Sequence, residues 1–222
     1  MIARGSSREE IIKRLADSKP WPKVEGTPRS QRTRGREADR AALIESFTTK
    51  ATAAGAAVRR ASGNNAAAKE VTSVMKEGSY RSAVISHEEI IGAAGIGDIL
   101  IDAGIRVTPL QKDTSAHREA CFTADVGITG AYAGIAETGS LVLIFDRNNP
   151  RLISHAPFCH IAMLFVKDII PDTETLFLRL SERGISPSAM ALVTGPSMTA
   201  DIALTPIRGI HGPGEVVIIL ID

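Results

Sequence analysis

Residues 124–146, with the sequence ADVGITGAYAGIAETGSLVLIFD, are the stretch that decides the fold class. Two short apolar segments, Asp125–Thr129 and Leu141–Phe145, have the length of β-strands and enclose turns made of small residues. A lone carboxylate, Glu137, lies between these turns. Strands with continuous apolar runs are typical of a sheet that is covered on both faces. The stretch therefore predicts a buried sheet whose strands end in glycine-rich turns.

Strands and helices alternate along most of the chain. We expect further strands at Ser82–Ser86, Ile105–Val107, His160–Val166, Ala189–Val193 and Val216–Ile221. We expect helices at residues 37–62, Ala66–Lys76, His87–Ala93 and Asp172–Arg183, the last with Leu176, Phe177 and Leu180 facing inward. This alternation predicts a three-layer α/β/α domain with a mostly parallel sheet.

The first 36 residues differ in composition from the rest. Ser7–Glu10 has the pattern of a capping box and predicts a short helix, and the proline-containing, charged segment Lys19–Gly35 predicts a linker. We therefore expect an N-terminal helix with a basic linker in residues 1–36 and one α/β domain in residues 37–222.

The charge of the chain is unevenly distributed. Residues 1–60 hold 14 basic and 7 acidic residues, whereas the remainder holds 12 basic and 18 acidic ones. A basic segment of this kind can bind nucleic acid or simply be a solvated appendage. No aromatic residues are interleaved with the arginines between Arg29 and Arg36, so a nucleic-acid partner is not the favoured interpretation.

Composition also excludes several classes of protein. The longest apolar runs are far shorter than the roughly 20 residues of a membrane-spanning helix, and no signal peptide is recognisable at the start. The two cysteines, Cys121 and Cys159, form neither a disulfide framework nor a CxxC metal motif. We expect a cytoplasmic protein in a reducing compartment.

Three segments carry the residues that could bind a ligand. They are Glu137–Ser140, the stretch from Thr194 to Ile202, and Gly209–Gly214. Ligands of parallel sheets bind at the carboxyl ends of the strands, so we expect the three segments to meet there. Glu137 could be an acid, base or nucleophile, or only a loop carboxylate that accepts backbone hydrogen bonds. His211 could bind an anion or exchange protons, or cap the turn before the last strand.

The middle segment is expected to follow a strand and open a helix. Ser197 or Thr199 would then be the N-cap, and the backbone amides could bind phosphate or carboxylate; plain capping is the alternative. Arg151 could bring a cation to the same rim. His155, Cys159, His160 and His211 do not have a recognised zinc-ligand spacing, so no metal site is expected.

Four motifs resemble those of the LUD domain, the family of lactate utilization protein C. They are Asp125–Thr129, Ala136–Ser140, Gly195–Ser197 followed by Thr199–Ile202, and Gly209-x-His211-Gly212-Pro213. The resemblance covers roughly residues 37–222. It implies a fold similar to the sugar-phosphate isomerase and CoA-transferase group.

The residues themselves supply the candidates for the site. Candidate catalytic residues are Glu137 and His211, and the candidate ligand-binding residues are Thr129, Thr138, Gly139, Ser140, Arg151, Gly195, Pro196, Ser197, Thr199, Asp201 and Gly212.

The resemblance also implies a function. It suggests a component that assists the oxidation of L-lactate to pyruvate together with partner proteins that carry iron–sulfur clusters. Two cysteines are too few for one such cluster, so this chain resembles the cluster-free component and is expected to bind no cofactor itself. We expect it to bind a small carboxylate or other anion. The sequence leaves open whether the protein forms a homo-oligomer. The alternative is a stand-alone enzyme that acts on a CoA ester, a sugar phosphate or a folate through Glu137, and the sequence does not decide between them.

Overall fold

The computed structural model describes residues 39–109, 114–200 and 206–222. The chain separates into two units, Met1–Arg36 and Glu37–Asp222, and every described residue belongs to the second. The helix and linker expected within residues 1–36 lie outside the described residues and stay predictions. None of the described helices combines the length and the apolar character that crossing a membrane requires.

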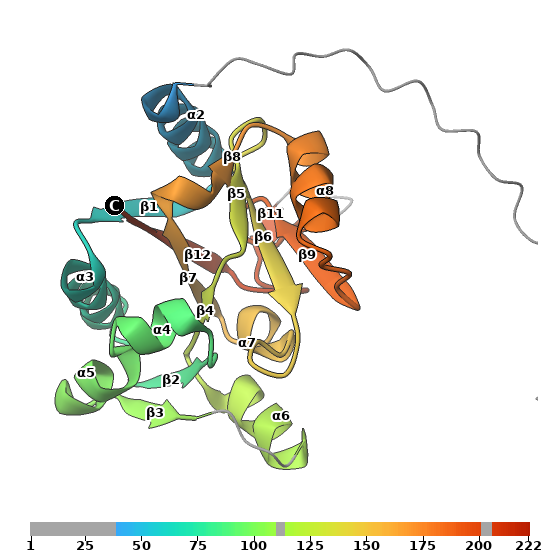
Figure 1. Cartoon of the computed structure of the whole chain (residues 1–222). Coiled ribbons are helices and arrows are strands. Elements are labelled where there is room, and N and C mark those ends of the chain that lie inside the picture. The colour runs from blue at the N-terminus through green and yellow to red at the C-terminus, as the bar shows by residue number, and fades with distance from the viewer. Residues whose placement is uncertain (1–38, 110–113, 201–205) are drawn as a thin grey trace, which may run out of the picture. The chain divides into compact units, whose positions relative to one another are not determined.

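A sheet of six parallel strands forms the centre of the domain. Its order is β1-β12-β7-β4-β2-β3, and every neighbouring pair is parallel. The strands are β1 (Ala57–Ala61), β2 (Ser82–Ile85), β3 (Arg106–Thr108), β4 (Val126–Gly130), β7 (Cys159–Phe165) and β12 (Glu215–Ile221). Helices flank this sheet (Figure 1), so the expected α/β fold with a mostly parallel sheet is confirmed.

The last strand explains why these segments read as continuous apolar runs. Successive side chains of a strand point to opposite faces. In β12, one apolar cluster contains Val217, Ile219 and Ile221. The alternating residues Val216, Ile218 and Leu220 belong to another cluster. Both faces of β12 are therefore covered.

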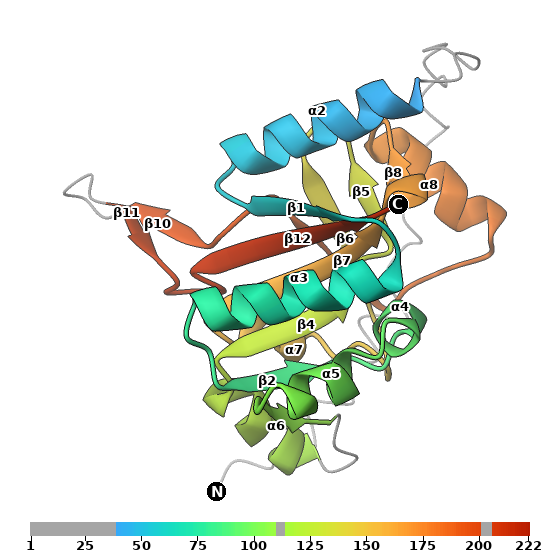
Figure 2. The same cartoon turned by 90° about the vertical axis from the view of Figure 1, so that its left-hand side faces the viewer.

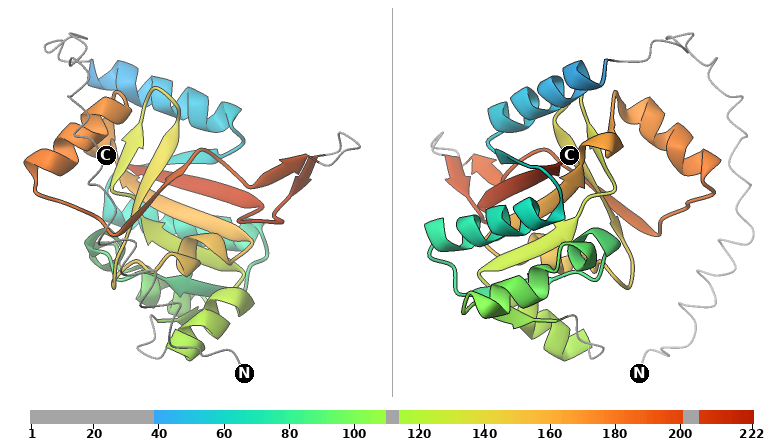
Figure 3. Two further views of the ribbon diagram at one scale, coloured as in Figure 1. Left: turned by 90° about the vertical axis from the view of Figure 1, so that its right-hand side faces the viewer. Right: turned by 60° about the vertical axis from the view of Figure 1, so that its left-hand side comes forward.

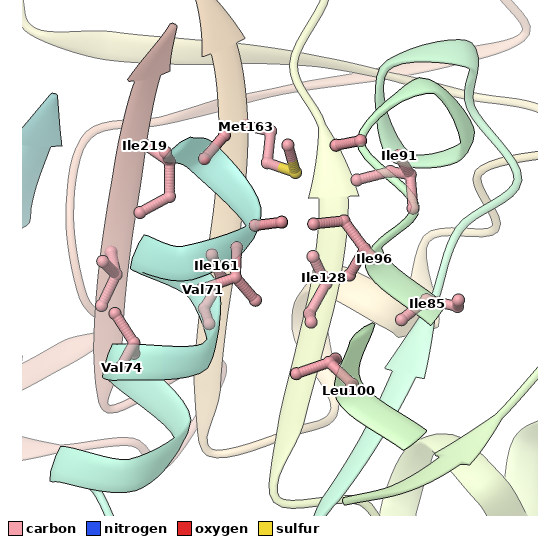
Figure 4. Packing of buried hydrophobic residues seen from close by; sticks show 14 of the residues in the cluster. Val71, Val74, Ile85, Ile91, Ile96, Leu100, Ile128, Ile161, Met163 and Ile219 are labelled. Atoms are coloured by element: carbon pink, nitrogen blue, oxygen red, sulfur yellow. The ribbon is translucent and has the colours of Figure 1, made fainter. Parts of the chain in front are cut away.

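Three helices cover the first face. They are α3 (Asn64–Glu77), α4 (Glu89–Ala93) and α5 (Ile96–Asp102). Figure 4 shows Val71 and Val74 of α3 packed towards the strands, near Ile161 and Ile219. In Figure 2, α3 crosses in front of β12, β7 and β4.

The opposite face is covered by a helix and by a second sheet. The helix is α2 (Arg40–Ala53), whose Phe47 and Ala51 pack in one cluster with residues of β7 and β12. The second sheet has the order β8-β5-β6-β9, with β5 (Ala133–Ile135), β6 (Ser140–Phe145), β8 (Ile169–Ile170) and β9 (Ala189–Val193). Helix α8 (Thr173–Glu182) packs against it through Leu176 and Leu180.

Helices α6 (Thr114–Thr123) and α7 (Leu152–His155) lie near β2 and β4, and the short 3₁₀ helix η1 spans Val166–Asp168.

Three details of the sequence interpretation are wrong. The expected helix over residues 37–62 ends at Ala53, because Gly55 adopts a φ of +94° and the chain then enters β1. The chain after Ser197 forms a hairpin of β10 (Met198–Ala200) and β11 (Pro206–Arg208) and does not open a helix. Phe177 points outward with 57% of its surface exposed.

Two strands that were expected in the main sheet belong to the second one. They are β6 and β9, which pair with each other in antiparallel register. The reason is that β5 and β6 form a hairpin, which turns the chain away from the main sheet directly after β4. The hairpin of β10 and β11 projects near the amino end of β12, on the opposite side from α4 (Figures 2 and 3).

Candidate functional site

The turn that contains Glu137 lies against the last turns of α2. The amino group of Lys50 donates to the backbone carbonyl of Glu137 over 2.5 Å, and the Glu137 side chain is exposed. Gly139 has a φ of +72°, and a Cβ atom there would lie 2.3 Å from the backbone nitrogen of Ala51. Only a glycine allows this approach, so Gly139 has a structural role in docking the turn on α2.

Three hydroxyl groups link this turn to the segment after β9. The Ser140 hydroxyl lies 2.7 Å from the Thr138 hydroxyl and 2.7 Å from the Thr194 hydroxyl. Ser140 is buried, whereas Thr138 and Thr194 are exposed. The first two predicted segments therefore meet through Ser140 and Thr194.

The segment after Thr194 meets the turn before β12. Ser197 donates its backbone N–H to the carbonyl of Pro213 over 2.8 Å, and a Cβ atom on Gly212 would lie 3.4 Å from the Ser197 side chain. Pro196 packs beside Gly55, and a Cβ atom on Gly195 would lie 2.4 Å from the carbonyl oxygen of Ala54. His211 is exposed at this turn.

These contacts place the second and third segments near the amino end of β12, not at the carboxyl ends of the main-sheet strands. Gly214 directly precedes β12, and Glu215 donates its backbone N–H to the carbonyl of Phe158, which directly precedes β7. The expectation that the three segments meet at the carboxyl edge is wrong, because β5 and β6 carry the Glu137 turn onto α2 and β9 leads to the amino side.

The remaining predicted residues are dispersed. Thr129 is completely buried on β4, and its hydroxyl lies 2.9 Å from Nε2 of His160. Arg151 is exposed and directly precedes α7. Thr199 lies within β10, and Asp201 lies outside the described residues. The structure does not test the function of any of these residues, so the predicted site stays a prediction.

The carboxyl edge of the main sheet has a cleft of its own. It lies where β2, β4 and β7 end and has a volume of about 720 Å³. Its polar lining residues are Asn64, Glu88, Glu89, Tyr132, Asp146, Lys167, Asp168 and Arg183. A second hollow of about 330 Å³, between the loop after β2 and α5, shares Glu88 with this cleft. Glu88 therefore lines both hollows.

Glu88 is held in place by donors from two strand ends. Its Oε2 atom accepts hydrogen bonds from the Ser86 hydroxyl at 2.9 Å and from the Gly130 backbone N–H at 2.5 Å. Burial raises the pKa of the Glu88 carboxyl to about 7, and the negative charge of Asp146 adds to the increase. The hydrogen bonds oppose this shift but do not cancel it. Glu88 can therefore gain or lose a proton near neutral pH.

Other polar groups surround the same cleft. The Tyr132 hydroxyl is buried and has no hydrogen-bond partner among the described residues. The ammonium group of Lys167 lies 4.6 Å from the centre of the Phe165 ring, and Arg183 is exposed. Neither cation forms an ion pair within the described part of the chain. Two cations thus share the cleft with Glu88, and the enclosed Tyr132 hydroxyl does not open into it.

The described residues do not form a metal site. No three His, Cys, Asp or Glu side chains in the described ranges are arranged to hold a metal ion. His160 is buried, and burial lowers its pKa to about 3, with His155 adding to the decrease. Both cysteines are buried free thiols whose pKa values burial raises.

The sequence interpretation missed Glu88. The signal was present, because Ser86-His87-Glu88 directly follows a buried strand, where parallel sheets bind their ligands. The sequence interpretation places these residues at the start of a helix over His87–Ala93 and assigns no role to Glu88. Helix α4 begins at Glu89, and the Glu88 side chain bonds to β4 rather than to that helix.

The fold and these segments can now be compared with known proteins. A family model described as the LUD domain matches residues 44–221. The chain belongs to the LUD domain family. The predicted resemblance is thereby confirmed, and it covers most of the described unit.

Two relatives of this LUD protein show how far the similarity extends. An uncharacterized protein from Neisseria meningitidis serogroup B is 33% identical over 138 residues, which are 61% of this chain and 57% of that protein. Lactate utilization protein C from Oceanobacillus iheyensis is 37% identical over 103 residues, which are 45% of this chain and 44% of that protein. The matches therefore span about half the length of these relatives.

A solved structure shares the fold. The crystal structure of a DUF162 family protein from Deinococcus radiodurans has a TM-score of 0.60 at 20% identity, covering 82% of this chain and 98% of that one. At this identity the likeness shows the fold alone. The expected similarity to the sugar-phosphate isomerase and CoA-transferase group stays an expectation.

Proposed function

We propose that this LUD protein is a component of a lactate utilization system. The observation that carries the proposal is the family match over residues 44–221, together with several relatives that are named lactate utilization protein C. These matches cover only part of each relative. A role in lactate utilization is therefore proposed for this chain and does not follow from the matches alone.

Within that system, we assign this chain the role of the cluster-free cytoplasmic component. It would assist the oxidation of L-lactate to pyruvate beside iron–sulfur partner proteins and bind a small anionic ligand. The composition supports this role, because two buried cysteines cannot supply the thiolates of one cluster. Electrons would then pass through the partners, and this chain would contribute binding or positioning.

A genetic experiment tests the proposed function. The gene is deleted in its source organism, and growth is compared on L-lactate and on pyruvate as the sole carbon source. We expect growth to be lost on L-lactate only and to be restored by the intact gene. Unimpaired growth of the deletion strain on L-lactate would refute the proposal.

A biochemical experiment tests the assignment to lactate oxidation. Extracts of the deletion strain are assayed for L-lactate-dependent reduction of an artificial electron acceptor. We expect added purified protein to restore the rate. If the extract without the protein reduces the acceptor at the wild-type rate, the protein has no part in the oxidation.

The alternative from the sequence is a stand-alone enzyme that uses Glu137 on a CoA ester, a sugar phosphate or a folate. The exposed position of Glu137 leaves it accessible to such a substrate. A compound of these classes that binds the folded protein must raise its melting temperature. If none does, the stand-alone enzyme is excluded for these substrates.

A further inference from the structure

We propose that the cleft at the carboxyl ends of β2, β4 and β7 binds a small carboxylate that carries a hydroxyl or oxo group on carbon 2, with Glu88 as the hydrogen-bond partner of that oxygen. The choice of L-lactate and pyruvate as probes rests on the proposed function. The location and the residues rest on the geometry of the cleft alone.

The position of the cleft is the first argument. Parallel sheets bind ligands beyond the carboxyl ends of their strands, and here the ends of β4 and β7 and the loop after β2 line one cleft. Its volume of about 720 Å³ lies within the range of small-molecule sites. Ile90, Ile144 and Ile185 add apolar side chains to its lining.

The carboxyl group of Glu88 is the second argument. Ser86 and Gly130 donate to one of its oxygens and fix its orientation at the wall of the cleft. The ionised form accepts a hydrogen bond from a hydroxyl group, and the neutral form donates one to a carbonyl oxygen. Held in this place, the carboxyl group can serve a 2-hydroxy acid in its ionised form and a 2-oxo acid in its neutral form, and burial raises its pKa to about 7.

The charges around the cleft are the third argument. Lys167 and Arg183 have no carboxylate partner in the described part of the chain, so either can pair with the carboxylate of the ligand. Two of the acidic lining residues are already engaged. Asp168 lies 3.3 Å from Arg179. Asp146 accepts hydrogen bonds from the backbone N–H groups of Asn148 and Asn149. The charge of Arg179 offsets that of Asp168, whereas no cation in the described part of the chain pairs with Asp146 or Glu89. The pairing of the ligand carboxylate with Lys167 or Arg183 therefore has to outweigh their repulsion.

Calorimetric titration of the full chain tests this inference. L-lactate and pyruvate are titrated at pH 7, with propionate as the matched acid that lacks the oxygen on carbon 2. We expect both probes to bind and propionate to bind at least tenfold more weakly. Glu88→Gln should weaken L-lactate at least tenfold, because its amide nitrogen cannot accept a hydrogen bond from the 2-hydroxyl group, and should weaken pyruvate less. Glu119→Gln, an exposed position on α6 outside the cleft, should leave the affinity within about twofold.

A second measurement covers the case in which Glu88→Gln does not fold. The ¹³C signal of the Glu88 side-chain carboxyl in the wild-type protein should shift when L-lactate is added and stay unchanged with propionate. Equal affinity of propionate, normal binding by folded Glu88→Gln, or no binding of either probe at millimolar concentration overturns the inference. The proposed function is tested by growth and this inference by binding, so the two can fail separately. If the deletion strain fails to grow on L-lactate but the protein binds neither probe, the inference is wrong and the proposed function stands.

Discussion

The backbone N–H of Gly130 donates a hydrogen bond to Oε2 of Glu88 over 2.5 Å. This contact joins the end of β4 to the loop that follows β2, at the edge where both strands terminate. It holds a half-buried carboxyl group at the wall of the cleft, although no sequence motif marks that group as functional. The local fold thus positions Glu88 before any ligand arrives.

The raised pKa of Glu88 predicts a pH-dependent cost in stability. Its pKa moves from 4.5 to about 7 on folding, so the folded protein holds this proton more tightly than the unfolded chain. Stability relative to Glu88→Gln should therefore fall as the pH rises from about 4.5 to about 7, and level off above. The full difference is about 3 kcal/mol at 1.36 kcal/mol per pKa unit. Urea unfolding of both proteins at pH 5, 6, 7 and 8 measures it.

The matched control for this experiment is Glu119→Gln. Its side chain is exposed on α6, so its effect on stability should not follow the same course between pH 5 and pH 8. If the free energies of unfolding of wild type and Glu88→Gln differ by a constant amount over this range, burial does not raise the pKa of the Glu88 carboxyl.

The pair of Thr129 and His160 predicts a loss of stability when one hydroxyl is removed. The Thr129 hydroxyl lies 2.9 Å from Nε2 of His160, and the two residues are 0% and 1% exposed. Thr129→Val preserves the shape but leaves the imidazole nitrogen without its partner. We expect a loss of about 1–3 kcal/mol in the free energy of unfolding. Thr52→Val, at an exposed position on α2, should change it little, and equal values for both variants would contradict the prediction.

Much of the fold could be predicted, because apolar strand segments and amphipathic helices depend on short-range patterns. Strand β12 shows this, since its alternating apolar residues are covered on both faces. The error over residues 57–61 has a physical cause. Ala57–Ala61 continues a stretch with helical spacing, and only its parallel pairing with β12, far away in the sequence, makes it a strand. Such long-range pairing is not visible in a local pattern.

The candidate site was harder to predict for a related reason. Segments that follow strands were expected to share one edge, but β9 enters a second sheet and delivers Thr194–Ser197 to the opposite side. Which sheet a strand joins decides where its following loop lies. The importance of Glu88 depends on its burial and on a hydrogen bond to Gly130, 42 residues away, and neither can be read from the residues around it.

Two motif glycines predict a steric effect on α2. Gly139 and Gly195 have φ angles of +72° and +130°, and added Cβ atoms would lie 2.3 and 2.4 Å from backbone atoms of Ala51 and Ala54. Alanine at either position should cost about 2 kcal/mol or more, because it adds a clash to an unfavourable φ. Gly184→Ala is the control, since its φ is +62° but nothing lies within 4 Å, and it should cost about 1 kcal/mol.

Thermal unfolding of the three alanine variants checks this prediction. A clash with α2 is indicated if Gly139→Ala and Gly195→Ala melt clearly below Gly184→Ala. Equal melting temperatures would mean that α2 yields to the added methyl group, and the role of these glycines would then be sought outside packing.

Removal of the Tyr132 hydroxyl separates stability from binding. The hydroxyl has no hydrogen-bond partner among the described residues, so Tyr132→Phe should not lower the free energy of unfolding and could raise it by up to about 1 kcal/mol. If the hydroxyl serves the ligand, the same variant should bind L-lactate more weakly. Urea unfolding and calorimetry on one preparation measure both effects. A loss of stability with unchanged binding would assign the hydroxyl to the fold instead.

Growth on L-lactate compares the two candidate carboxylates directly. Glu137→Gln and Glu88→Gln make the same chemical change, one at the exposed turn between β5 and β6 and the other at the carboxyl edge of the main sheet. Each variant is expressed in the deletion strain, and its abundance is checked by immunoblot so that lost growth is not lost protein. If the cleft is the functional site, Glu88→Gln fails to restore growth while Glu137→Gln restores it. The opposite outcome would assign function to the Glu137 turn and its hydroxyl-linked neighbours Ser140 and Thr194, because their contacts depend on that turn and not on the cleft.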